Sequence, residues 1–430
     1  MRHLGFLESN LSGSGFEGLR VAKELGLHVT FITRSMDRYL AIPGGPQYFD
    51  KYVDEIVHCE TNDLQTVLST VLPLHARAPF AGFLTFGEYD VVAAAATARE
   101  LGLPTTRPDG VAVARNKFLM RERCARAGIA MPGFAGVESE SEARDAAVSL
   151  GLPCVVKPAD ETASFDVARC STLSEVTAQF RLISGKAANI RGQRRFPKIL
   201  VEEYARGFEV SVEVIAEGER VQVLGVTDKS VAGNGRFVEV GHVFPSLLPP
   251  DVVASCAGLA VAALRAVGFD LGMAHVEIRV TEDGPKLIEI NARPAGGGIT
   301  DLVDAALGIS CLELVIRQYL GEPVLDRLAF ALFASRPRGA AVRFLTAAPG
   351  RVTSVGDLTP AERMPGVRKV KVSVSAGDTV NPLERNIDRL GYVFAVADHA
   401  YLAARQAESA ASEVEIFTSP DQRSELEAVA

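Results

Sequence analysis

Residues 272–298 read GMAHVEIRVTEDGPKLIEINARPAGGG, and this stretch decides the fold. Apolar and polar side chains alternate over Met273–Val280 and again over Leu287–Asn291, which predicts two strands with one apolar and one polar face. Between them, Glu282-Asp283-Gly284 has the composition of a three-residue hairpin turn with glycine last. We therefore expect a β-hairpin whose apolar face includes Ile288 and Ile290.

A hairpin centred on Asp283 sets Glu277 opposite Glu289 and His275 opposite Asn291. Two carboxylates and an amide then converge on the polar face. Because ionised carboxylates at close range repel each other, one would hold a proton unless a cation lies between them. Mg²⁺ takes oxygen ligands of this kind together with phosphates and water. The pattern favours a magnesium site, and the alternative is a solvated strand face on which the acids coincide by chance.

The residues after the hairpin support this site. Arg293 continues the polar alternation of the second strand, and the run Gly296–Gly298 leads into a helix for which we expect Thr300 as the N-cap. Exposed amides at the start of a helix bind anions. A metal, an arginine and an anion cradle in one place indicate phosphoryl chemistry.

Two lysines indicate the same chemistry. Lys157 ends an apolar run, where its charge is costly unless it pairs with a phosphate or an acid. The alternative is an edge lysine that reaches solvent. Lys117 begins a helix with Asn116 as its expected N-cap, and the helix dipole disfavours a cation there unless it meets an anion.

Residues 199–209, ILVEEYARGFE, predict a strand, a turn and a second strand. Backbone groups at such a turn could contact the edge of an adenine, and Glu209 could hold ribose hydroxyls. Taken without its context, the segment is a strand pair with surface acids.

Composition excludes several classes of protein. The chain has 430 residues, with Asp+Glu 53 against Lys+Arg 45 and a net charge of −8, which argues against a protein that works by neutralising nucleic-acid phosphates. The six cysteines form no CxxC pair, so neither a zinc ribbon nor a redox motif is expected. The N-terminus lacks a long apolar run and Arg265 breaks the longest Ala/Val-rich stretch, so we expect a cytoplasmic protein without a membrane span.

The first hundred residues predict an α/β domain. Expected strands at Leu4–Leu7, Val29–Thr33 and Phe80–Phe86 alternate with helices, as in a parallel sheet covered on both faces. Residues 13–18, GSGFEG, fit the GxGxxG pattern of dinucleotide sites, but Arg34 stands where such a site needs an acid. The glycines therefore indicate a tight strand-to-helix turn, with an NADP site as the alternative.

The chain resembles the ATP-grasp superfamily and, within it, the carboxylate–amine (L-amino acid) ligases. The resemblance covers nearly the whole chain and is carried by Val156-Lys157-Pro158, by the E-x-x-x-G-x-E of Glu203–Glu209, by Glu277 with Glu289–Arg293, and by Asp388–Tyr392. It implies an ATP-grasp fold of mixed α/β and α+β class, with an N-terminal Rossmann-like α/β domain and a β-rich C-terminal lobe.

Domain boundaries follow from the resemblance. The N-terminal domain takes residues 1–108, the ATP-grasp core 109–328 and the C-terminal lobe 329–430. Within the core, a small lid subdomain spans residues 132–205 and a large subdomain spans 206–328.

The resemblance also implies which residues bind the nucleotide. Lys117 and Lys157 would contact the ATP phosphates, with Lys157 also near the adenine, and Glu209 would bind the ribose. Further residues of the nucleotide site would be Glu202, Glu203, Tyr204, Ala205, Ser164 and Lys229.

Metal and substrate contacts are implied in the same way. The ligands of one or two Mg²⁺ ions, or of Mn²⁺ in their place, would be Glu277, Glu289 and Asn291. Arg293 would stabilise the acyl phosphate and the tetrahedral intermediate, while Gly296 and Gly297 would lie near the substrate carboxylate. His275 is a weaker substrate candidate, while Glu88 and the loop at residues 237–245 are expected to contribute to selectivity.

The implied function is an ADP-forming ligase that joins a small carboxylic acid or amino acid to an amine through an acyl phosphate. Another ATP-grasp reaction, such as a carboxylation or a purine-pathway ligation, stays open, as does a non-catalytic nucleotide-binding protein. The implied partners are small molecules, and a homodimer is common among similar enzymes. One departure stands out: the lid loop Ala159–Asp166 has no glycine, although this loop is usually rich in glycine and serine, and Ser164 alone is assigned a contact there.

Overall fold

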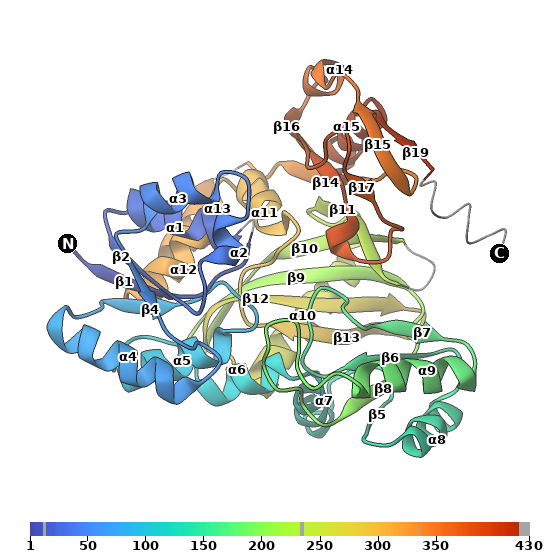
Figure 1. Ribbon diagram of the computed structural model, residues 1–430, viewed down its shortest axis with the longest axis horizontal. Helices are drawn as coiled ribbons and strands as arrows, with labels where there is room; N and C mark the ends of the chain where they lie inside the picture. The colour runs from blue at the N-terminus through green and yellow to red at the C-terminus, as the bar shows by residue number, and fades with distance from the viewer. Residues whose placement is uncertain (12–13, 233–235, 335, 421–430) are drawn as a thin grey trace.

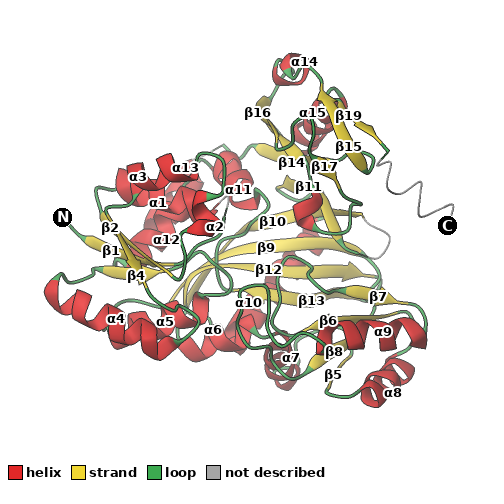
Figure 2. Ribbon diagram, in the orientation of Figure 1, coloured by secondary structure: helices red, strands yellow, loops and turns green. Residues whose placement is uncertain are grey.

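The computed structural model describes residues 1–11, 14–232, 236–334 and 336–420. Four β-sheets and their helices make up the described chain (Figure 1). The largest sheet runs through the centre of the molecule, with the N-terminal sheet at one end and two smaller sheets at the other (Figure 2). This arrangement confirms the expected ATP-grasp class with an N-terminal α/β part and a β-rich C-terminal part.

The N-terminal sheet is parallel and has the strand order β3-β2-β1-β4. Its strands are β1 (His3–Leu7), β2 (His28–Thr33), β3 (Glu55–His58) and β4 (Gly82–Leu84). Its helices are α1 (Ser14–Glu24), α2 (Asp37–Leu40), α3 (Gly45–Tyr52), α4 (Leu64–Arg77) and α5 (Val91–Glu100). Apolar side chains of α4 and α5 cover one face, and those of α1 and α3 cover the other, as the alternation of strands and helices predicts.

Close packing accounts for the described glycines of the GxGxxG pattern. Gly13 lies outside the described residues. A Cβ atom on Gly15 would come within 2.4 Å of the Asn10 carbonyl oxygen, and one on Gly18 within 2.3 Å of the Phe86 ring. Helix α1 can approach its neighbours this closely only without side chains there, which fits the tight-turn interpretation.

The central sheet has the strand order β13-β12-β9-β10-β11-β14-β18-β16. Its strands are β9 (Phe208–Glu217), β10 (Arg220–Ala232), β11 (Val238–Phe244), β12 (Leu271–Thr281), β13 (Gly284–Asn291), β14 (Gly339–Leu345), β16 (Val367–Val372) and β18 (Gly391–Ala397). One face is covered by α6 (Pro108–Arg115), α7 (Lys117–Arg126) and α10 (Pro250–Val267). Because β11 pairs with β14, strands of the C-terminal part continue the sheet of the core.

Helix α10 is long and apolar enough, by length and composition, to cross a membrane. It carries Asp251 and Arg265, and it buries Cys256, Ala260 and Leu264 in the same core cluster as the strands β9 and β12. These contacts are typical of a core helix that lies against a sheet.

The β12–β13 hairpin pairs Glu277 with Glu289 and His275 with Asn291, as predicted. The turn is shorter than expected, because Thr281 already pairs with Gly284. A bulge opposite Glu277 and Ile278 absorbs the extra residue and restores the predicted pairing beyond it.

The bulge overturns one prediction about this hairpin. Leu287 and Ile290 occupy the apolar core, while Ile288 lines the cavity on the other face, so its predicted orientation was wrong. The predicted N-cap of the following helix α11 (Ile299–Leu307) was also wrong. Gly298, at φ 78°, is the N-cap, and Thr300 Oγ1 instead donates to the Ala295 carbonyl at 2.9 Å.

The remaining sheets are small and antiparallel. One has the order β5-β8-β6-β7 and its own apolar cluster under α8 (Glu140–Leu150) and α9 (Leu173–Ser184). Its strands are β5 (Phe134–Val137), β6 (Cys154–Pro158), β7 (Ala168–Cys170) and β8 (Ile199–Glu203). The other sheet consists of β15 (Gly350–Val355), β17 (Thr379–Val380) and β19 (Ile416–Ser419).

The other helices are α12 (Cys311–Tyr319), α13 (Leu325–Ala334), α14 (Thr359–Glu362), η1 (Asn386–Asp388) and α15 (Ala400–Ser412). The proposed boundary at residue 328 falls within α13. The domain boundaries stay a proposal.

Candidate active site

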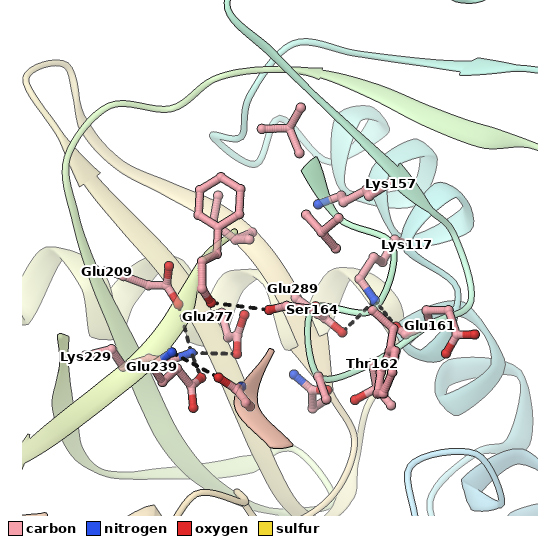
Figure 3. Close-up of a pocket in the computed structure, with 18 of the residues that line it drawn as sticks. Lys117, Lys157, Glu161, Thr162, Ser164, Glu209, Lys229, Glu239, Glu277 and Glu289 are labelled. Atoms are coloured by element: carbon pink, nitrogen blue, oxygen red, sulfur yellow. Dashed lines mark hydrogen bonds and ion pairs between the residues drawn. The ribbon is translucent and has the colours of Figure 1, made fainter. Parts of the chain in front are cut away.

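A cavity of about 320 Å³ lies between the β5–β8 sheet and the polar face of the central sheet (Figure 3). Its walls come from α7, β6, the lid loop, β8–β13, the segment after β13 and η1 (Asn386–Asp388) with Arg389. The predicted site residues that line it are Lys117, Lys157, Ser164, Glu202, Glu203, Tyr204, Ala205, Glu209, Lys229, His275, Glu277, Glu289, Asn291, Arg293, Gly296 and Gly297. Glu88 does not line the cavity, but it contacts Arg293 from behind, with 2.5 Å between Arg293 Nε and Glu88 Oε2. The chain therefore brings the predicted residues together, although their individual roles stay a prediction.

Lys229 is enclosed by three carboxylates on the floor of the cavity. Its Nζ lies 2.9 Å from Glu209 Oε1, 2.9 Å from Glu239 Oε1 and 2.8 Å from Glu277 Oε1. Burial disfavours its charge, but the three acids outweigh burial and hold the pKa of Lys229 well above its usual value. Lys229 in turn helps to hold the pKa of Glu277 and Glu239 below the usual range. This part of the site therefore carries fixed charges of both signs.

His275 lies beside this group. Its Nδ1 is 2.8 Å from Glu213 Oε1 and its Nε2 is 3.3 Å from Glu277 Oε1. Burial disfavours the imidazolium, but Glu213 and Glu277 overcome it and raise the pKa of His275 to about 9. His275 is therefore a cation, and its charge helps to hold the Glu277 carboxylate in place.

Lys117 contacts the other acid of the hairpin. Its Nζ lies 2.8 Å from Glu289 Oε1 and donates to the Glu161 carbonyl at 2.5 Å. Asn116 is the N-cap of α7, as predicted, because its side chain accepts from the amides of Phe118 and Leu119. The cap fixes the first turn of α7, and with it the position of the Lys117 ammonium beside the hairpin.

Lys157 pairs with an acid, one of the two partners expected for a buried lysine. Its Nζ lies 2.7 Å from Glu202 Oε2, while Arg121 Nε donates to Glu202 Oε1 at 2.8 Å. Burial lowers the pKa of Lys157. Burial would raise the pKa of Glu202, but Arg121 and Lys157 lower it to about 2. Arg121 and Lys157 therefore hold the Glu202 carboxylate from two sides, and the ion pair fixes the Lys157 ammonium at the cavity wall.

The lid loop adopts glycine-like backbone conformations without glycine. Ala163, Ser164 and Asp166 have φ angles of 54°, 60° and 58°. Left-handed conformations cost other residues on the order of 1–2 kcal/mol each. The Ser164 hydroxyl reaches the Phe237 carbonyl across the cavity, at 3.5 Å. The loop therefore has the shape usually supplied by glycine.

The acids of the lid loop are paired with a basic strap, residues 186–196. Arg195 Nη2 lies 3.0 Å from Glu161 Oε1 and 2.9 Å from Asp166 Oδ2, and Lys186 Nζ lies 2.6 Å from Asp166 Oδ1. Tyr89 of the N-terminal part donates its hydroxyl to Glu161 at 2.6 Å. The acids of the lid loop thus attach it to the strap and to the loop after β4.

Arg293 and the glycines that follow form the far end of the cavity. Arg293 Nη2 donates to Asn291 Oδ1 at 3.4 Å. Among the described residues, no atom lies within 4 Å of a Cβ built on Gly296, whereas a Cβ on Gly297, at φ 61°, would lie 3.1 Å from His242 Nε2. Space for a ligand therefore remains beside Arg293 and Gly296.

The donor set fits a hard divalent cation. Glu277, Glu289 and Asn291 place oxygen atoms on one hairpin face, and each of the two carboxylates attracts a lysine ammonium. The carboxylate oxygens of Glu209, Glu239 and Glu277 also lie within 4.8 Å of one another. Positive charge is thus favoured at the positions where the resemblance implies Mg²⁺.

Several residues of the site were missed by sequence reasoning. Glu239 lies in the segment 237–245, which was expected to be a loop that contributes to selectivity and instead forms β11, but the residue was not singled out. Arg121 is one of three arginines on α7. Glu213 and Arg389 approach the site only in the folded chain. Glu213 on β9 lies beside His275 on β12, and Arg389, directly after η1, lies 3.6 Å from Glu239 on β11. The quoted Asp388–Tyr392 segment was the one signal that pointed to Arg389.

Comparisons with known proteins match three family models along the chain. They are the ATP-grasp N-terminal domain over residues 19–105, the ATP-grasp domain over 150–301 and the L-amino acid ligase C-terminal domain 2 over 343–419. The third match bears on function because it falls outside the nucleotide-binding core.

Similar proteins agree with these matches. An uncharacterized protein, y4rH, of Sinorhizobium fredii is 27% identical over 92% of this chain and 79% of its own length. A D-alanine–D-alanine ligase of Cupriavidus metallidurans is 28% identical over 53% of this chain and 70% of its own length. The crystal structure of an L-amino acid ligase from Bacillus licheniformis superposes with a TM-score of 0.81 at 22% identity, covering 97% of this chain and 99% of that one.

Proposed function

This chain belongs to the ATP-grasp carboxylate–amine ligases, which are ADP-forming enzymes, and we propose that it joins the carboxyl group of an amino acid or small carboxylic acid to an amine. The observation that carries the proposal is the β12–β13 pairing. It sets Glu277 opposite Glu289 and His275 opposite Asn291, with Arg293 directly after. Phosphoryl transfer to a carboxylate needs this combination of oxygen ligands and a fixed cation.

The nucleotide would lie along the cavity, with its phosphates toward Lys117 and Lys157 and its ribose near Glu209. Glu202 and Ala205 would line the adenine end. Mg²⁺ held by Glu277, Glu289 and Asn291 would neutralise charge on the phosphates. The lysine–carboxylate contacts of the site support these roles. An incoming phosphate would take the place of the carboxylate beside the lysine, and the metal would take the place of the lysine beside the carboxylate.

The product of the first step would be an acyl phosphate on the carboxylic substrate, which the amine then attacks. Arg293 would offset the negative charge that develops on oxygen in both steps. The lid loop, held by Arg195 and Tyr89, would keep water away from the acyl phosphate. We also keep two finer predictions, a homodimer and a cytoplasmic location, which sedimentation and cell fractionation would check.

An assay of ADP release with mixed amino acids tests the function. We expect release that depends on both an acid and an amine, together with one amide formed per ADP. Glu289→Ala should abolish turnover, because it removes an oxygen ligand and leaves Lys117 without its carboxylate partner. Glu282→Ala is the matched control, since Glu282 is an exposed acid at the tip of the same hairpin.

Three results would contradict the proposal. If no acid–amine pair supports ADP release, the chain is not a ligase of this kind. ADP release that needs bicarbonate would indicate a carboxylase. Full activity of Glu289→Ala would remove the metal assignment while leaving the reaction in place.

A further inference from the structure

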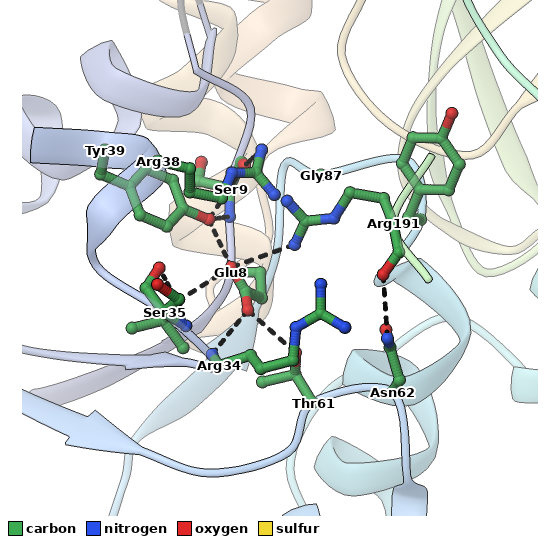
Figure 4. A network of polar contacts seen from close by, with 12 residues as sticks. Glu8, Ser9, Arg34, Ser35, Arg38, Tyr39, Thr61, Asn62, Gly87 and Arg191 are labelled. Carbon is green, nitrogen blue, oxygen red and sulfur yellow. Dashed lines mark hydrogen bonds and ion pairs between the residues drawn. The ribbon is translucent and has the colours of Figure 1, made fainter. Parts of the chain in front are cut away.

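A second polar cluster lies at the carboxyl ends of the N-terminal strands (Figure 4). The strand order β3-β2-β1-β4 means that the chain leaves β1 on one side and returns to its other side. In open α/β sheets, ligands bind outside the carboxyl ends of the strands at such a switch point. Here the crevice lies between residues 8–10, after β1, and residues 85–90, after β4.

Glu8 anchors this cluster. It is 1% exposed, and its carboxylate accepts from the Arg34 amide at 2.8 Å, from Thr33 and Thr61, and from the Tyr39 hydroxyl. Its φ of 53° is a strained conformation for a glutamate. Because its oxygens are fully used by these donors, Glu8 positions its neighbours and leaves no oxygen for a ligand.

Two arginines converge above Glu8. Arg191 Nη2 lies 3.2 Å from Glu8 Oε2, and Arg38 donates to the Ser9 carbonyl at 3.4 Å with its guanidinium 4.8 Å from the centre of the Tyr39 ring. Figure 4 shows both arginine side chains extending toward Glu8 and Ser9. Arg191 comes from the strap and is held against the N-terminal part by Asn62, which donates to its carbonyl at 2.9 Å.

Three donors of this cluster lack a partner. Within the part of the chain that the structure describes, Arg191 Nε, Arg38 Nη1 and Ser9 Oγ make no hydrogen bond. Ser9 is 3% exposed and Arg191 is 9% exposed, so water reaches these groups poorly. Buried donors are rarely left unpaired. Glu8 offsets the charge of Arg191, and an anion beside Arg191 Nε, Arg38 Nη1 and Ser9 Oγ would supply the acceptor that these three donors lack.

The cluster adjoins the active site through the loop after β4. A Cβ on Gly87 would lie 3.5 Å from the Ser9 carbonyl carbon, while the next residue, Glu88, contacts Arg293. The loop after β4 thus borders both the cluster and the Arg293 end of the cavity.

We propose that Arg38, Arg191 and Ser9 form an anion subsite that holds a carboxylate or phosphate of the amine substrate. This inference rests on the proposed function. It assigns the amine substrate to a class: an amino acid or amine that carries a second acidic group. The α-amine would then lie toward Glu88 and Arg293.

Calorimetric titration tests the subsite without turnover. L-aspartate, L-glutamate and O-phospho-L-serine should bind the wild-type protein, and their neutral counterparts L-asparagine, L-glutamine and L-serine should bind more weakly. Arg38→Gln, at a partly exposed position that leaves the fold intact, should weaken acidic ligands roughly tenfold or more and neutral ligands much less. Arg191→Lys and Ser9→Ala should act in the same direction. Arg20→Gln is the control, because Arg20 on α1 carries the same charge and pairs with Glu17 and Glu24.

Steady-state kinetics with the same ligands as amine substrates complete the test. Arg38→Gln should raise the KM of acidic amines and leave the KM of ATP unchanged. Equal losses for acidic and neutral amines, or no change, would overturn the subsite. Binding of inorganic phosphate that acidic amino acids do not displace would overturn its assignment to the substrate. Specific anion binding without any ligase turnover would overturn the proposed function and leave the subsite standing.

Discussion

Arg121 shows how a residue outside the cavity determines the geometry inside it. Its side chain is fully buried and donates to Glu202 Oε1 at 2.8 Å and to the carbonyls of Leu287 and Ile288, both at 2.9 Å. It thus connects α7 to β8 and to the bulged strand β13. Glu202, held in this way, fixes Lys157.

We predict that Arg121→Ala lowers the free energy of unfolding by about 3–5 kcal/mol, since it leaves the buried Glu202 with a single cation and two carbonyls without a donor. Urea denaturation followed by circular dichroism measures the change. Arg126→Ala, on the exposed side of the same helix, should change the free energy of unfolding by less than about 0.5 kcal/mol. Equal effects of the two variants would show that Arg121 does not carry the Glu202 contact.

Asp304 makes stability depend on pH. Its carboxylate accepts from the Cys311 amide at 2.8 Å, and burial raises its pKa to about 7. The folded chain therefore binds more protons than the unfolded chain between the usual aspartate pKa and about 7, so stability falls as pH rises through this window.

Asp304→Asn removes the titrating group and keeps an oxygen that can accept from Cys311. Relative to wild type, the free energy of unfolding of the variant should rise by on the order of 2–4 kcal/mol as the pH increases from about 4 to about 8. Thermal unfolding across this pH range measures the difference in stability. A difference that does not vary with pH would show that Asp304 is ionised in the folded chain throughout.

At the residue scale, the sequence predicted the side chains whose chemistry is unusual for their position. Lys157 at the end of an apolar strand and Arg293 after a paired hairpin stand out in this way. Glu239 and Arg121 do not, because Arg121 meets Glu202 81 residues away and Glu239 reaches Lys229 only across the β10–β11 pairing. Contacts of this kind exist only once the sheets are assembled.

At the scale of the element, the hairpin was predicted for a partly wrong reason. Alternation and the position of Asp283 give the correct pairing of Glu277 with Glu289, but the two-residue turn alone would shift it by one residue. The bulge at Ile288 corrects the shift, and Arg121 binds the carbonyl groups on either side of the bulge. Since the bulge is supported by α7, the hairpin sequence alone does not reveal it.

The strap, residues 186–196, explains the unusual lid loop. Arg195 contacts Glu161 and Asp166 with a largely buried side chain, so it fixes two acids of a loop whose backbone is strained. We predict that Arg195→Ala loosens the lid and admits water to the acyl phosphate. ADP release should then exceed amide formation by roughly threefold or more.

The ratio of ADP to amide at saturating substrates is the measurement that checks this. Arg194→Ala is the matched control, because Arg194 is the exposed neighbouring arginine of the strap. If Arg195→Ala slows both products equally, the contact positions substrate and does not exclude water.

At the scale of the whole molecule, the parts of the chain differ in how they share a core. One apolar cluster includes Phe6 of the N-terminal sheet, Ile215 of the central sheet, Leu312 of α12 and Val342 of β14. The β5–β8 sheet instead buries Val156 in a separate cluster with α8 and α9. Contiguous domain boundaries drawn from the sequence do not capture this sharing, because β11–β14 pairing depends on strands about a hundred residues apart.

The separate cluster makes the β5–β8 sheet the part that nucleotide binding should stabilise most. The cavity lies between this sheet and the central sheet, so a bound nucleotide contacts both and adds its binding free energy to their association. At about 100 times its Kd, MgATP should stabilise the folded protein by about 2.7 kcal/mol.

We predict that amide hydrogen exchange in β6 and β8 slows about tenfold or more under these conditions, because opening of this sheet then requires loss of the ligand. Helix α4 lies on the outer face of the N-terminal sheet and serves as the internal control, whose exchange should change little. Uniform slowing in α4 and β8 would mean that the chain opens only as a whole, and Glu289→Ala should remove the protection of β6 and β8 if the metal site carries the binding.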